Sequence, residues 1–401
     1  MFATYASPLN RGVLEEARRL HGAVADRLEG YRASYFVSEA PVEIGGVGAA
    51  LIATGGTERL LLESFERGFR PVIIAAHPSF NSLPAMLEAR AALRGKGLSP
   101  LAVYVREPAE AASLLNALPR AVSISGSRLG LVGEPSPWLV ASSVDADAAE
   151  RVMGLELVKI GMEEFYREYR DSRPTGALDR VLGKCSVERP RAELEKALRV
   201  YTALKRLASR YRLDALTVRC FDILERLKTT ACLALSLLNS EGLVAGCEGD
   251  MQSLVTMYLA HRLTGRPAWM ANPARVEGDT ILLAHCTAPI KWGVKCRLTT
   301  HFESGIGVGL DVALPRGKVV LARIDGRLER IYLSGALVKE SGMGLPGLCR
   351  SQVRVKVEGD PWKLLDALPG NHVVVAPAPA EWGLRVAAAL YGVEVVEPLA
   401  G

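Results

Sequence analysis

Four polar side chains that can take part in chemistry follow apolar runs in the middle of the sequence. They are Arg219 after LTV, Glu248 after LVAGC, Asn272 after AWMA and His285 after ILLA. In an open parallel sheet, ligands bind beyond the carboxyl ends of the strands. If the four runs are successive strands of one sheet, the four side chains share one edge and form a polar pocket.

Glu248 also has a purely structural interpretation. Gly249 and Asp250 lead into a predicted helix, and a carboxylate at this point either caps the helix or stabilises its positive end. Asn272 and His285 favour the pocket, because loop carboxylates scattered by chance need not share a sheet edge with them.

The remaining candidate histidines each have two interpretations. His301 and Glu303 in THFESG lie at i and i+2 of an expected antiparallel strand, so both point to one face. They either serve the site or are ordinary sheet residues. His77 and Asn81 follow the apolar run PVIIAA, and His372 lies in a GNH turn, where a solvated loop histidine is the default.

The cysteines do not have the spacing of a structural framework. There are seven, an odd number, with no CxxC pair, which argues against both a disulfide framework and a zinc ribbon. Most are expected to be buried small hydrophobic residues. Cys220, Cys247 and Cys286 adjoin strand ends, so a thiolate metal site stays open as an alternative.

Composition excludes several classes of protein. The chain has 401 residues, of which 49% are apolar, and a net charge of 49 − 44 = +5. These values are typical of a globular protein with two or three domains. The basic residues form no block, so no nucleic-acid partner is expected. No apolar run reaches the roughly 18 to 20 residues of a membrane helix, and the first residues lack a signal peptide's apolar stretch, so we expect a cytoplasmic protein.

The order of apolar runs predicts an α/β fold of three domains. In residues 1–127, strands such as ALIAT, PVIIAAH, PLAVYV and AVSIS alternate with helices, which predicts a parallel sheet. Residues 128–289 repeat this pattern from RLGLVG to the strands PAWMA and TILLAH. Residues 290–401 change to strands joined by turns. The expected fold is therefore two parallel-sheet, Rossmann-like α/β domains followed by a β-rich, antiparallel, barrel-like C-terminal domain.

Six strings in this sequence occur together in one known group of proteins. They are NSLPAMLEA, GLVGEPSPWLVAS, GCEGDMQSLVTMYLAHRLTGRPAWMAN, DTILLAHCTAP, CRSQVRV and GNHVVV. In this order they resemble the L-fucose isomerase and L-arabinose isomerase superfamily, and within it the shorter L-fucose isomerase-like branch. The match covers most of the chain, and CEGD combined with the late GNH is its most specific part.

The resemblance implies an activity and a cofactor. Members of the superfamily convert an aldose to its ketose through an enediol, bind Mn²⁺ through a Glu, an Asp and a His, and form trimers or hexamers with active sites between subunits. Carried over, the Glu is Glu248 and the His is His372, whereas the Asp position falls on Asn272. An Asn offers a neutral oxygen and cannot transfer a proton at neutral pH. The expected ion is Mn²⁺ or Mg²⁺, because oxygen ligands with an imidazole suit these ions.

This chemistry assigns expected roles to the candidate residues. Glu248 is expected to be metal ligand and base, with His372 and Asn272 as further ligands. The second acid is either Asp222 or Glu303 with His301. The expected substrate-binding residues are Arg219, His285, His301, Arg350, His77, Asn81 and Trp138.

Three functions follow from these residues. The first is a metal-dependent isomerase acting on a pentose, a 6-deoxyhexose or a modified sugar, with a small-molecule sugar as its ligand and a homotrimer or homohexamer as its assembly. The second is a catalytically silent sugar-binding protein, which Asn272 in place of Asp supports. The third is a lyase or epimerase acting on a sugar acid, for which Arg219 or Arg350 would be essential.

Overall fold

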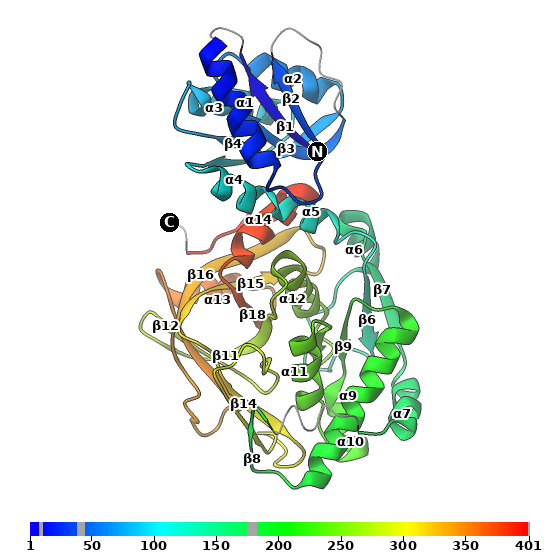
Figure 1. Cartoon of the computed structure of the whole chain (residues 1–401). Helices are drawn as coiled ribbons and strands as arrows, with labels where there is room; N and C mark the ends of the chain where they lie inside the picture. Colours follow the sequence, from blue (N-terminus) through cyan, green and yellow to red (C-terminus); the bar gives the residue numbers. More distant parts are fainter. Residues whose placement is uncertain (8–10, 38–44, 175–182, 400–401) are drawn as a thin grey trace. The chain divides into compact units, whose positions relative to one another are not determined.

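The computed structural model describes residues 1–7, 11–37, 45–174 and 183–399. Within it the chain divides into two compact units (Figure 1). The first unit comprises residues 1–123 and 382–392, and the second comprises residues 124–381 and 393–401. The division into three domains stays a prediction.

The first unit is built on a five-stranded parallel sheet in the order β2-β1-β3-β4-β5. Its elements are β1 (Phe2–Ala6), α1 (Arg11–Ala25), β2 (Ala33–Val37), β3 (Gly46–Ile52), α2 (Glu58–Glu66), β4 (Phe69–Ala76), α3 (Ser82–Gly95), β5 (Leu101–Tyr104), α4 (Pro108–Leu115), α5 (Ala117–Val122) and most of α14 (Ala380–Tyr391). The parallel sheet predicted here is confirmed, although β1 and β2 were not among the predicted strands.

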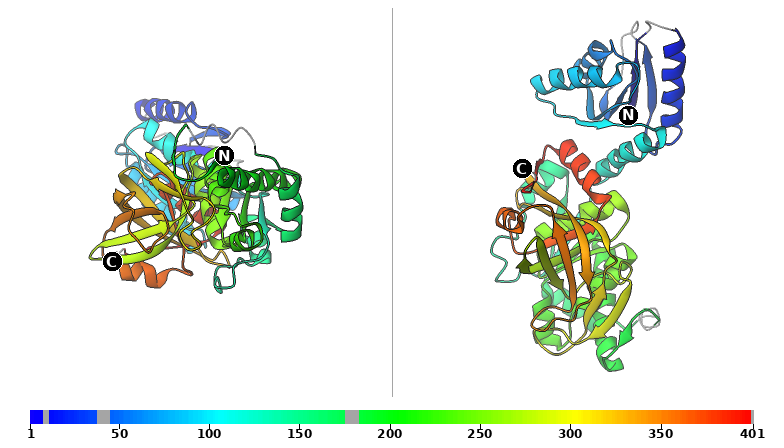
Figure 2. Two further views of the ribbon diagram at one scale, coloured as in Figure 1. Left: turned by 90° about the horizontal axis from the view of Figure 1, so that it is seen from below. Right: turned by 90° about the vertical axis from the view of Figure 1, so that its left-hand side faces the viewer.

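Helices cover both faces of this sheet, so its strands are buried on both sides. Ala3 and Tyr5 pack with residues of α2 and α3, whereas Ala6 packs with Ala17 of α1 on the opposite face. The right-hand view of Figure 2 shows α1 on one side of the sheet and α2 and α3 on the other. This alternation follows the two-residue period of a strand.

The second unit contains a four-stranded parallel sheet in the order β10-β9-β6-β7. Its strands and helices are β6 (Arg128–Val132), α6 (Ala146–Met153), β7 (Glu156–Ile160), α7 (Met162–Asp171), α9 (Arg191–Tyr211), β9 (Ala215–Val218), α10 (Cys220–Leu227), α11 (Cys232–Glu241), β10 (Val244–Cys247) and α12 (Met251–Thr264).

The same unit contains a closed antiparallel β-barrel. Six strands pair in the order β15-β18-β11-β12-β17-β16, and β16 pairs back to β15, which closes the barrel. The strands are β11 (Trp269–Glu277), β12 (Thr280–His285), β15 (Gly317–Ile324), β16 (Arg330–Ser341), β17 (Ser351–Val357) and β18 (Val373–Pro377), with β19 (Glu394–Val396) added in parallel to β16 and α13 (Pro361–Ala367) between β17 and β18. The chain is therefore a mixed α/β protein with parallel sheets and a closed barrel.

Two predicted strands belong to a different sheet from the one expected. PAWMA and TILLAH were predicted to extend the second parallel sheet, but β11 and β12 are antiparallel neighbours in the barrel. Glu277 pairs with Thr280, so only Gly278 and Asp279 connect them. A parallel connection needs a dozen or more residues, so this two-residue turn imposes a hairpin.

Two further predictions about local structure are wrong. The run AVSIS is not a strand, because its first residues complete α5 and the rest form a turn. Short apolar runs of this length do not distinguish a strand from a helix. His301 and Glu303 are not on a strand either, since they lie in a turn that follows β13 (Lys295–Thr299).

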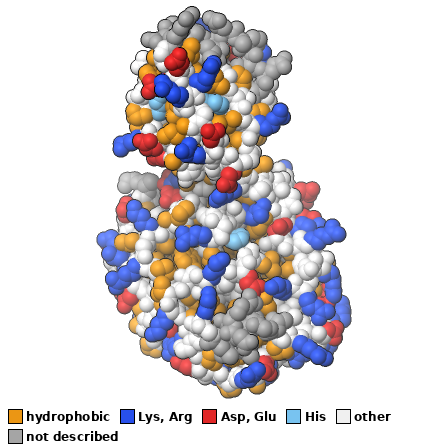
Figure 3. Space-filling model, in the orientation of Figure 1, with side chains coloured by type: hydrophobic (Ala, Val, Ile, Leu, Met, Phe, Trp, Pro, Cys, Tyr) orange, Lys and Arg blue, Asp and Glu red, His pale blue; other side chains and the backbone are white. Residues whose placement is uncertain are grey.

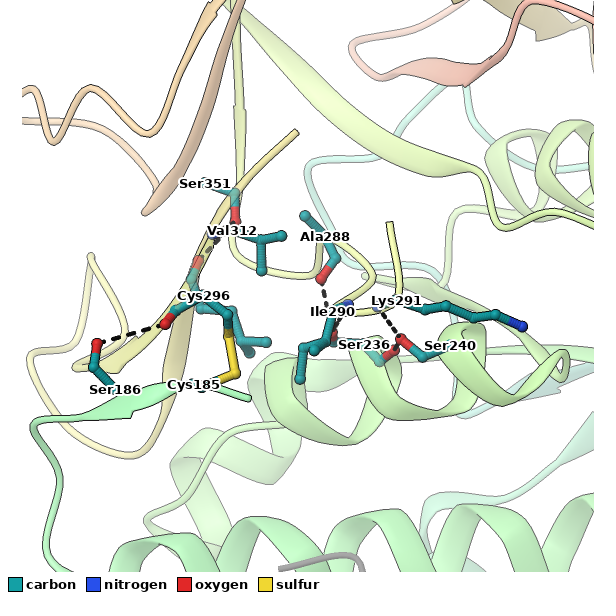
Figure 4. The surroundings of a disulfide bond; sticks show 11 residues. Cys185, Ser186, Ser236, Ser240, Ala288, Ile290, Lys291, Cys296, Val312 and Ser351 are labelled. Carbon is teal, nitrogen blue, oxygen red and sulfur yellow. Dashed lines mark hydrogen bonds between the residues drawn. A yellow bond between two sulfur atoms is a disulfide. The ribbon is translucent and has the colours of Figure 1, made fainter. Parts of the chain in front are cut away.

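A disulfide between Cys185 and Cys296 was not expected (Figure 4). It links the residue before β8 (Ser186–Val187) to β13, and both strands belong to a small sheet completed by β14 (Gly309–Ala313). The other five cysteines are free, and four of them are buried. The expectation of buried free thiols thus holds for most cysteines but not for this pair.

The loop between β12 and β13 is fixed by hydroxyl groups of α11. Ser236 Oγ donates to Ala288 O at 2.7 Å and accepts from Ile290 N at 3.1 Å, and Ser240 Oγ accepts from Lys291 N at 3.1 Å (Figure 4). These bonds hold the segment that begins at the end of β12, where His285 lies.

Helix α12 lies between the parallel sheet and the barrel. It packs against β9 and β10 on one side and against β11, β15 and β18 on the other. Residues around its whole circumference are buried, which is the pattern of a central rather than a surface helix. The helix begins at Met251, three residues after Glu248, so it contacts both sheets close to this glutamate.

Charged side chains of both signs share one face of the molecule. Lysine and arginine side chains are interspersed with acidic ones on the face in Figure 3. Within the described part of the chain, no helix is long and apolar enough to cross a membrane.

We predict that the disulfide stabilises the second unit. Cys185 and Cys296 are 111 residues apart, so removing the link by a Cys185→Ser/Cys296→Ser double substitution should lower the free energy of unfolding by about 2–4 kcal/mol. Urea unfolding followed by circular dichroism measures this, with Cys349→Ser, which breaks no disulfide, as control. Seven free thiols in the denatured, unreduced protein would contradict the prediction.

Candidate metal and substrate site

Glu248 lies in a tight turn between β10 and α12. Glu248 and Gly249 both have left-handed backbone conformations, with φ of 62° and 73°. Asp250 caps α12, because its Oδ1 accepts a hydrogen bond from Ser253 N at 2.7 Å. The cap of α12 is therefore Asp250 and not Glu248, for which capping was the structural interpretation. A left-handed glutamate costs free energy and is retained where the surrounding structure requires it.

Two buried histidines from the barrel face the Glu248 carboxylate. His285 ends β12 and His372 immediately precedes β18. The Nε2 atoms of His285 and His372 lie 3.6 Å and 3.7 Å from Glu248 Oε1. Within the described ranges, these three residues are the one group of three or more such side chains with the geometry of a metal site, their ligand atoms all lying within 4.8 Å of one another.

The second ring nitrogen of each histidine is already engaged. His285 Nδ1 is hydrogen-bonded with Thr287 Oγ1 at 3.0 Å, and His372 Nδ1 donates to Asp250 Oδ2 at 2.9 Å. His372 Nε2 is buried and has no hydrogen-bond partner. Both rings thus present Nε2 toward Glu248, as metal-binding histidines do when a carboxylate or hydroxyl fixes the other nitrogen.

The charges of this group perturb one another strongly. Burial raises the pKa of the Glu248 carboxyl, but the nearby imidazoles of His285 and His372 outweigh burial and hold the pKa well below its ordinary value. Burial lowers the pKa of His372, whereas Asp250 and Glu248 raise it to about 9. The carboxylate is therefore ionised at neutral pH and available as a ligand or base.

Arg323 is a functional candidate that sequence reasoning missed. It lies on β15, is fully buried, and its Nη1 is 3.1 Å from Asp250 Oδ2. The only signal in the sequence is an arginine within the apolar run KVVLARI, and apolar patterning alone reads that run as a core strand. A buried arginine requires a partner, and Asp250 supplies it.

A pocket opens beside the group. Its lining combines polar side chains with thiols and apolar side chains. The lining residues are Cys220, Phe221, Leu224, Thr230, Ala231, Cys232, Cys247, Glu248, Asn272, His285, Cys286, His301, Glu303 and Cys349. All five free cysteines line it.

Trp138 holds the other oxygen of Glu248. Its half-exposed indole donates from Nε1 to Glu248 Oε2 at 2.6 Å and packs edge-on against Phe221 of the pocket wall. The two carboxylate oxygens are thus distinguished, since Oε1 faces the histidines and Oε2 faces the indole.

Asn272, expected as a metal ligand, lines the pocket but has another partner. It lies within β11 rather than after a strand, and its Oδ1 accepts a hydrogen bond from Asn371 Nδ2 at 3.2 Å. Glu248, Asn272 and His285 do converge, but not at the edge of one parallel sheet. Glu248 follows a strand of that sheet, whereas Asn272 and His285 belong to the barrel.

Several expected site residues have partners outside the pocket lining. Arg219 Nε pairs with Asp222 Oδ1 at 2.8 Å, and neither residue is among those that line the pocket. Arg350 donates to Thr300 O at 2.9 Å and to Thr300 Oγ1 at 2.8 Å. His301 and Glu303 do line the pocket.

His77 and Asn81 belong to the first unit. His77 Nε2 is hydrogen-bonded with Ala53 O at 2.8 Å, and Asn81 precedes α3 in a left-handed conformation. Their expected role at a neighbouring subunit's pocket stays a prediction.

Comparison with known proteins points to sugar isomerases. The chain matches no family model. It is 23% identical over 224 residues to a sulfoquinovose isomerase of Alkalicoccus urumqiensis, covering 53% of this chain and 51% of the relative. It is 24% identical over 213 residues to a sulfoquinovose isomerase of Priestia aryabhattai, covering 49% and 47%. The chain spans about half the length of the curated relatives it matches.

We predict that the turn bearing Glu248 tolerates no side chain at Gly249. A Cβ there would lie 2.7 Å from Glu134 O and 2.8 Å from Pro135 Cα, so Gly249→Ala should lower the free energy of unfolding by about 2–4 kcal/mol. Gly265→Ala is the matched control, because its φ is 68° and nothing lies within 4 Å, so it should cost only about 1 kcal/mol of backbone strain. Equal losses in chemical denaturation would refute the close contact.

Proposed function

We propose that this protein is a metal-dependent aldose–ketose isomerase acting on a pentose or a 6-deoxyhexose-type sugar. The observation that carries the proposal is the ionised Glu248 carboxylate facing the Nε2 atoms of two buried histidines, His285 and His372. The Nε2 atom of His372 has no hydrogen-bond partner. The curated relatives named sulfoquinovose isomerase support sugar isomerisation at a coarse level. The L-fucose isomerase-like identity and the assembly as a homotrimer or homohexamer remain predictions.

Two imidazoles and one carboxylate suit a first-row transition-metal ion better than Mg²⁺, so of the two expected ions we propose Mn²⁺. Ligand atoms about 2.1 Å from one ion lie about 3 to 4.2 Å apart, and the two Nε2 to Oε1 separations of 3.6 and 3.7 Å are in that range. Glu248, His285 and His372 would hold the ion. In the proposed ligand set, His285 replaces Asn272, which the family resemblance implied as a ligand.

The residues of this chain supply the acid–base chemistry. Aldose–ketose isomerisation moves a proton from C2 to C1 and another from O2 to O1 through an enediol. When bound, a divalent cation supplies a Lewis acid for the negative charge on the substrate oxygens. Glu248 is the base: its low pKa keeps it unprotonated at rest, and its Oε2 is the oxygen that faces Trp138 rather than the histidines.

Trp138 keeps the base oriented. The hydrogen bond from its indole fixes the plane of the Glu248 carboxylate and leaves a second lone-pair direction on Oε2 for the substrate proton. The pocket walls of Phe221 and Leu224 limit water around the reacting carbons. Glu303 and His301, which also line the pocket, are better placed than Asp222 to be the second acid.

The lining of the pocket favours an uncharged sugar. None of the described residues that line it is a lysine or an arginine, and two are glutamates. Arg219 and Arg350, the candidates for binding an anionic substrate, are engaged with Asp222 and Thr300. We therefore propose a neutral aldose rather than the sulfonated sugar in the name of the relatives or a sugar acid.

The alternative function is a catalytically silent sugar-binding protein. Asn272 favours it, because a side-chain amide neither releases nor takes up a proton at neutral pH and so cannot replace the acid expected at this position. Glu248 distinguishes the two functions, since only the enzyme needs its carboxylate to move a proton.

We predict metal-dependent proton exchange in the substrate. Metal-stripped protein incubated in D₂O with neutral aldoses and ketoses should introduce deuterium at C1 or C2 only after Mn²⁺ is added, as followed by NMR. Glu248→Gln should lower the rate by at least about 10²-fold, because the general base is lost. Sugar binding without exchange in the wild type would support the silent binder instead.

We predict discrimination against anionic sugars. The kcat/KM for a neutral aldose should exceed that for sulfoquinovose by about 10-fold or more, because none of the described lining residues is a lysine or an arginine that could pair with the sulfonate. Arg219→Ala should leave the neutral activity within a few-fold of wild type. A preference for sulfoquinovose that Arg219→Ala or Arg350→Ala removes would contradict the assignment of a neutral substrate.

A further inference from the structure

A fully buried chain of charges extends behind His372, on the side away from the pocket. Asp250 Oδ2 accepts hydrogen bonds from His372 Nδ1 at 2.9 Å, Arg323 Nη1 at 3.1 Å and Ser253 Oγ at 2.9 Å. Asp250, His372 and Arg323 are each 0% exposed. An ion pair at this depth is costly to desolvate, so its retention calls for a role other than stability.

Arg323 fixes the main chain at His372 as well as the carboxylate beside it. Its Nη1 donates to His372 O at 2.8 Å in addition to Asp250. Its Nε donates to Gln252 Oε1 at 3.1 Å and its Nη2 to Ser142 Oγ at 2.9 Å, so the guanidinium cannot rotate. The backbone and the ring of His372 are therefore fixed by two partners that are themselves ion-paired.

The neighbouring glycine fits this arrangement. A Cβ at Gly370 would collide with the guanidinium of Arg323. The GNH turn can thus approach Arg323 closely only with glycine at its first position. This contact gives a physical reason for the glycine at the first position of the GNH motif. Gly370 contacts Arg323 behind the histidine and does not line the pocket.

The orientation of the ring follows from these contacts. Because Asp250 accepts a hydrogen bond from Nδ1, Nε2 is left to face Glu248 Oε1 at 3.7 Å, where it has no hydrogen-bond partner. Rotation of the ring would break the bond to Asp250 and turn Nε2 away from the site.

We propose that Asp250 and Arg323 are positioning residues that aim His372 Nε2 at a divalent cation shared with Glu248 and His285. This inference rests on the proposed function, because it requires that cation. It assigns a task to two residues that touch neither the pocket nor the substrate. Partners of this kind typically change metal affinity by about 10- to 100-fold.

The test measures Mn²⁺ binding to the full chain by the loss of the free-ion EPR signal, with the melting temperature recorded in parallel. Asp250→Asn removes the acceptor charge but leaves Arg323 uncompensated, so it is also expected to lower the melting temperature. The double variant Asp250→Asn/Arg323→Met removes both buried charges, so it should recover part of that loss. We expect both variants to bind Mn²⁺ about 10- to 100-fold more weakly than the wild type.

Asp311→Asn is the matched control. It removes a partly buried ion pair with Arg297 in the same unit without touching His372, so its Mn²⁺ affinity should equal that of the wild type. A folded double variant with wild-type affinity would overturn the positioning role and leave the proposed function intact. A wild-type protein that binds Mn²⁺ but moves no proton would refute the isomerase and leave the positioning role intact. No Mn²⁺ binding by the wild type would overturn both.

Discussion

The hydrogen bond between His372 Nδ1 and Asp250 Oδ2 is the interaction on which the rest of the site depends. It joins the start of α12, where Asp250 caps the helix, to the strand of the barrel that follows His372. It also connects the buried guanidinium of Arg323 to the imidazole that faces Glu248. One carboxylate thus caps a helix, neutralises a buried arginine and orients a histidine, so a change in any one of these would be transmitted to the other two.

The fold explains why such a carboxylate is needed. Glu248 belongs to the turn after a parallel strand, whereas His285 and His372 belong to a separately closed antiparallel barrel. Two sheets with independent hydrogen-bond networks do not fix each other to within a few tenths of an ångström. Helix α12 packs against both sheets, and its polar residues bond to the barrel, as when Thr256 Oγ1 accepts from Ile324 N at 3.0 Å. The helix therefore fixes the distance and orientation of the Glu248 carboxylate relative to the imidazoles of His285 and His372.

The sequence predicted the α/β class, the barrel-like strands and the convergence of Glu248, Asn272 and His285, but the convergence for a wrong reason. Apolar runs indicate strands without saying which sheet they join, and the two-residue turn at Gly278 and Asp279 was the overlooked sign that PAWMA and TILLAH form a hairpin. The disulfide of Cys185 could not be derived, because its partner is 111 residues away. Arg323 was missed because a single arginine within an apolar strand does not indicate its partner in the sequence. Only the fold shows that Asp250 lies beside it.

The most direct test of the central claim is an anomalous difference map at the manganese absorption edge from crystals grown with MnCl₂. We predict one strong peak within about 2.0 to 2.5 Å of a Glu248 carboxylate oxygen and of the Nε2 atoms of His285 and His372. Absence of a peak there, or a peak bound to the cysteines of the pocket wall with His372 Nε2 still facing Glu248 alone, would contradict it.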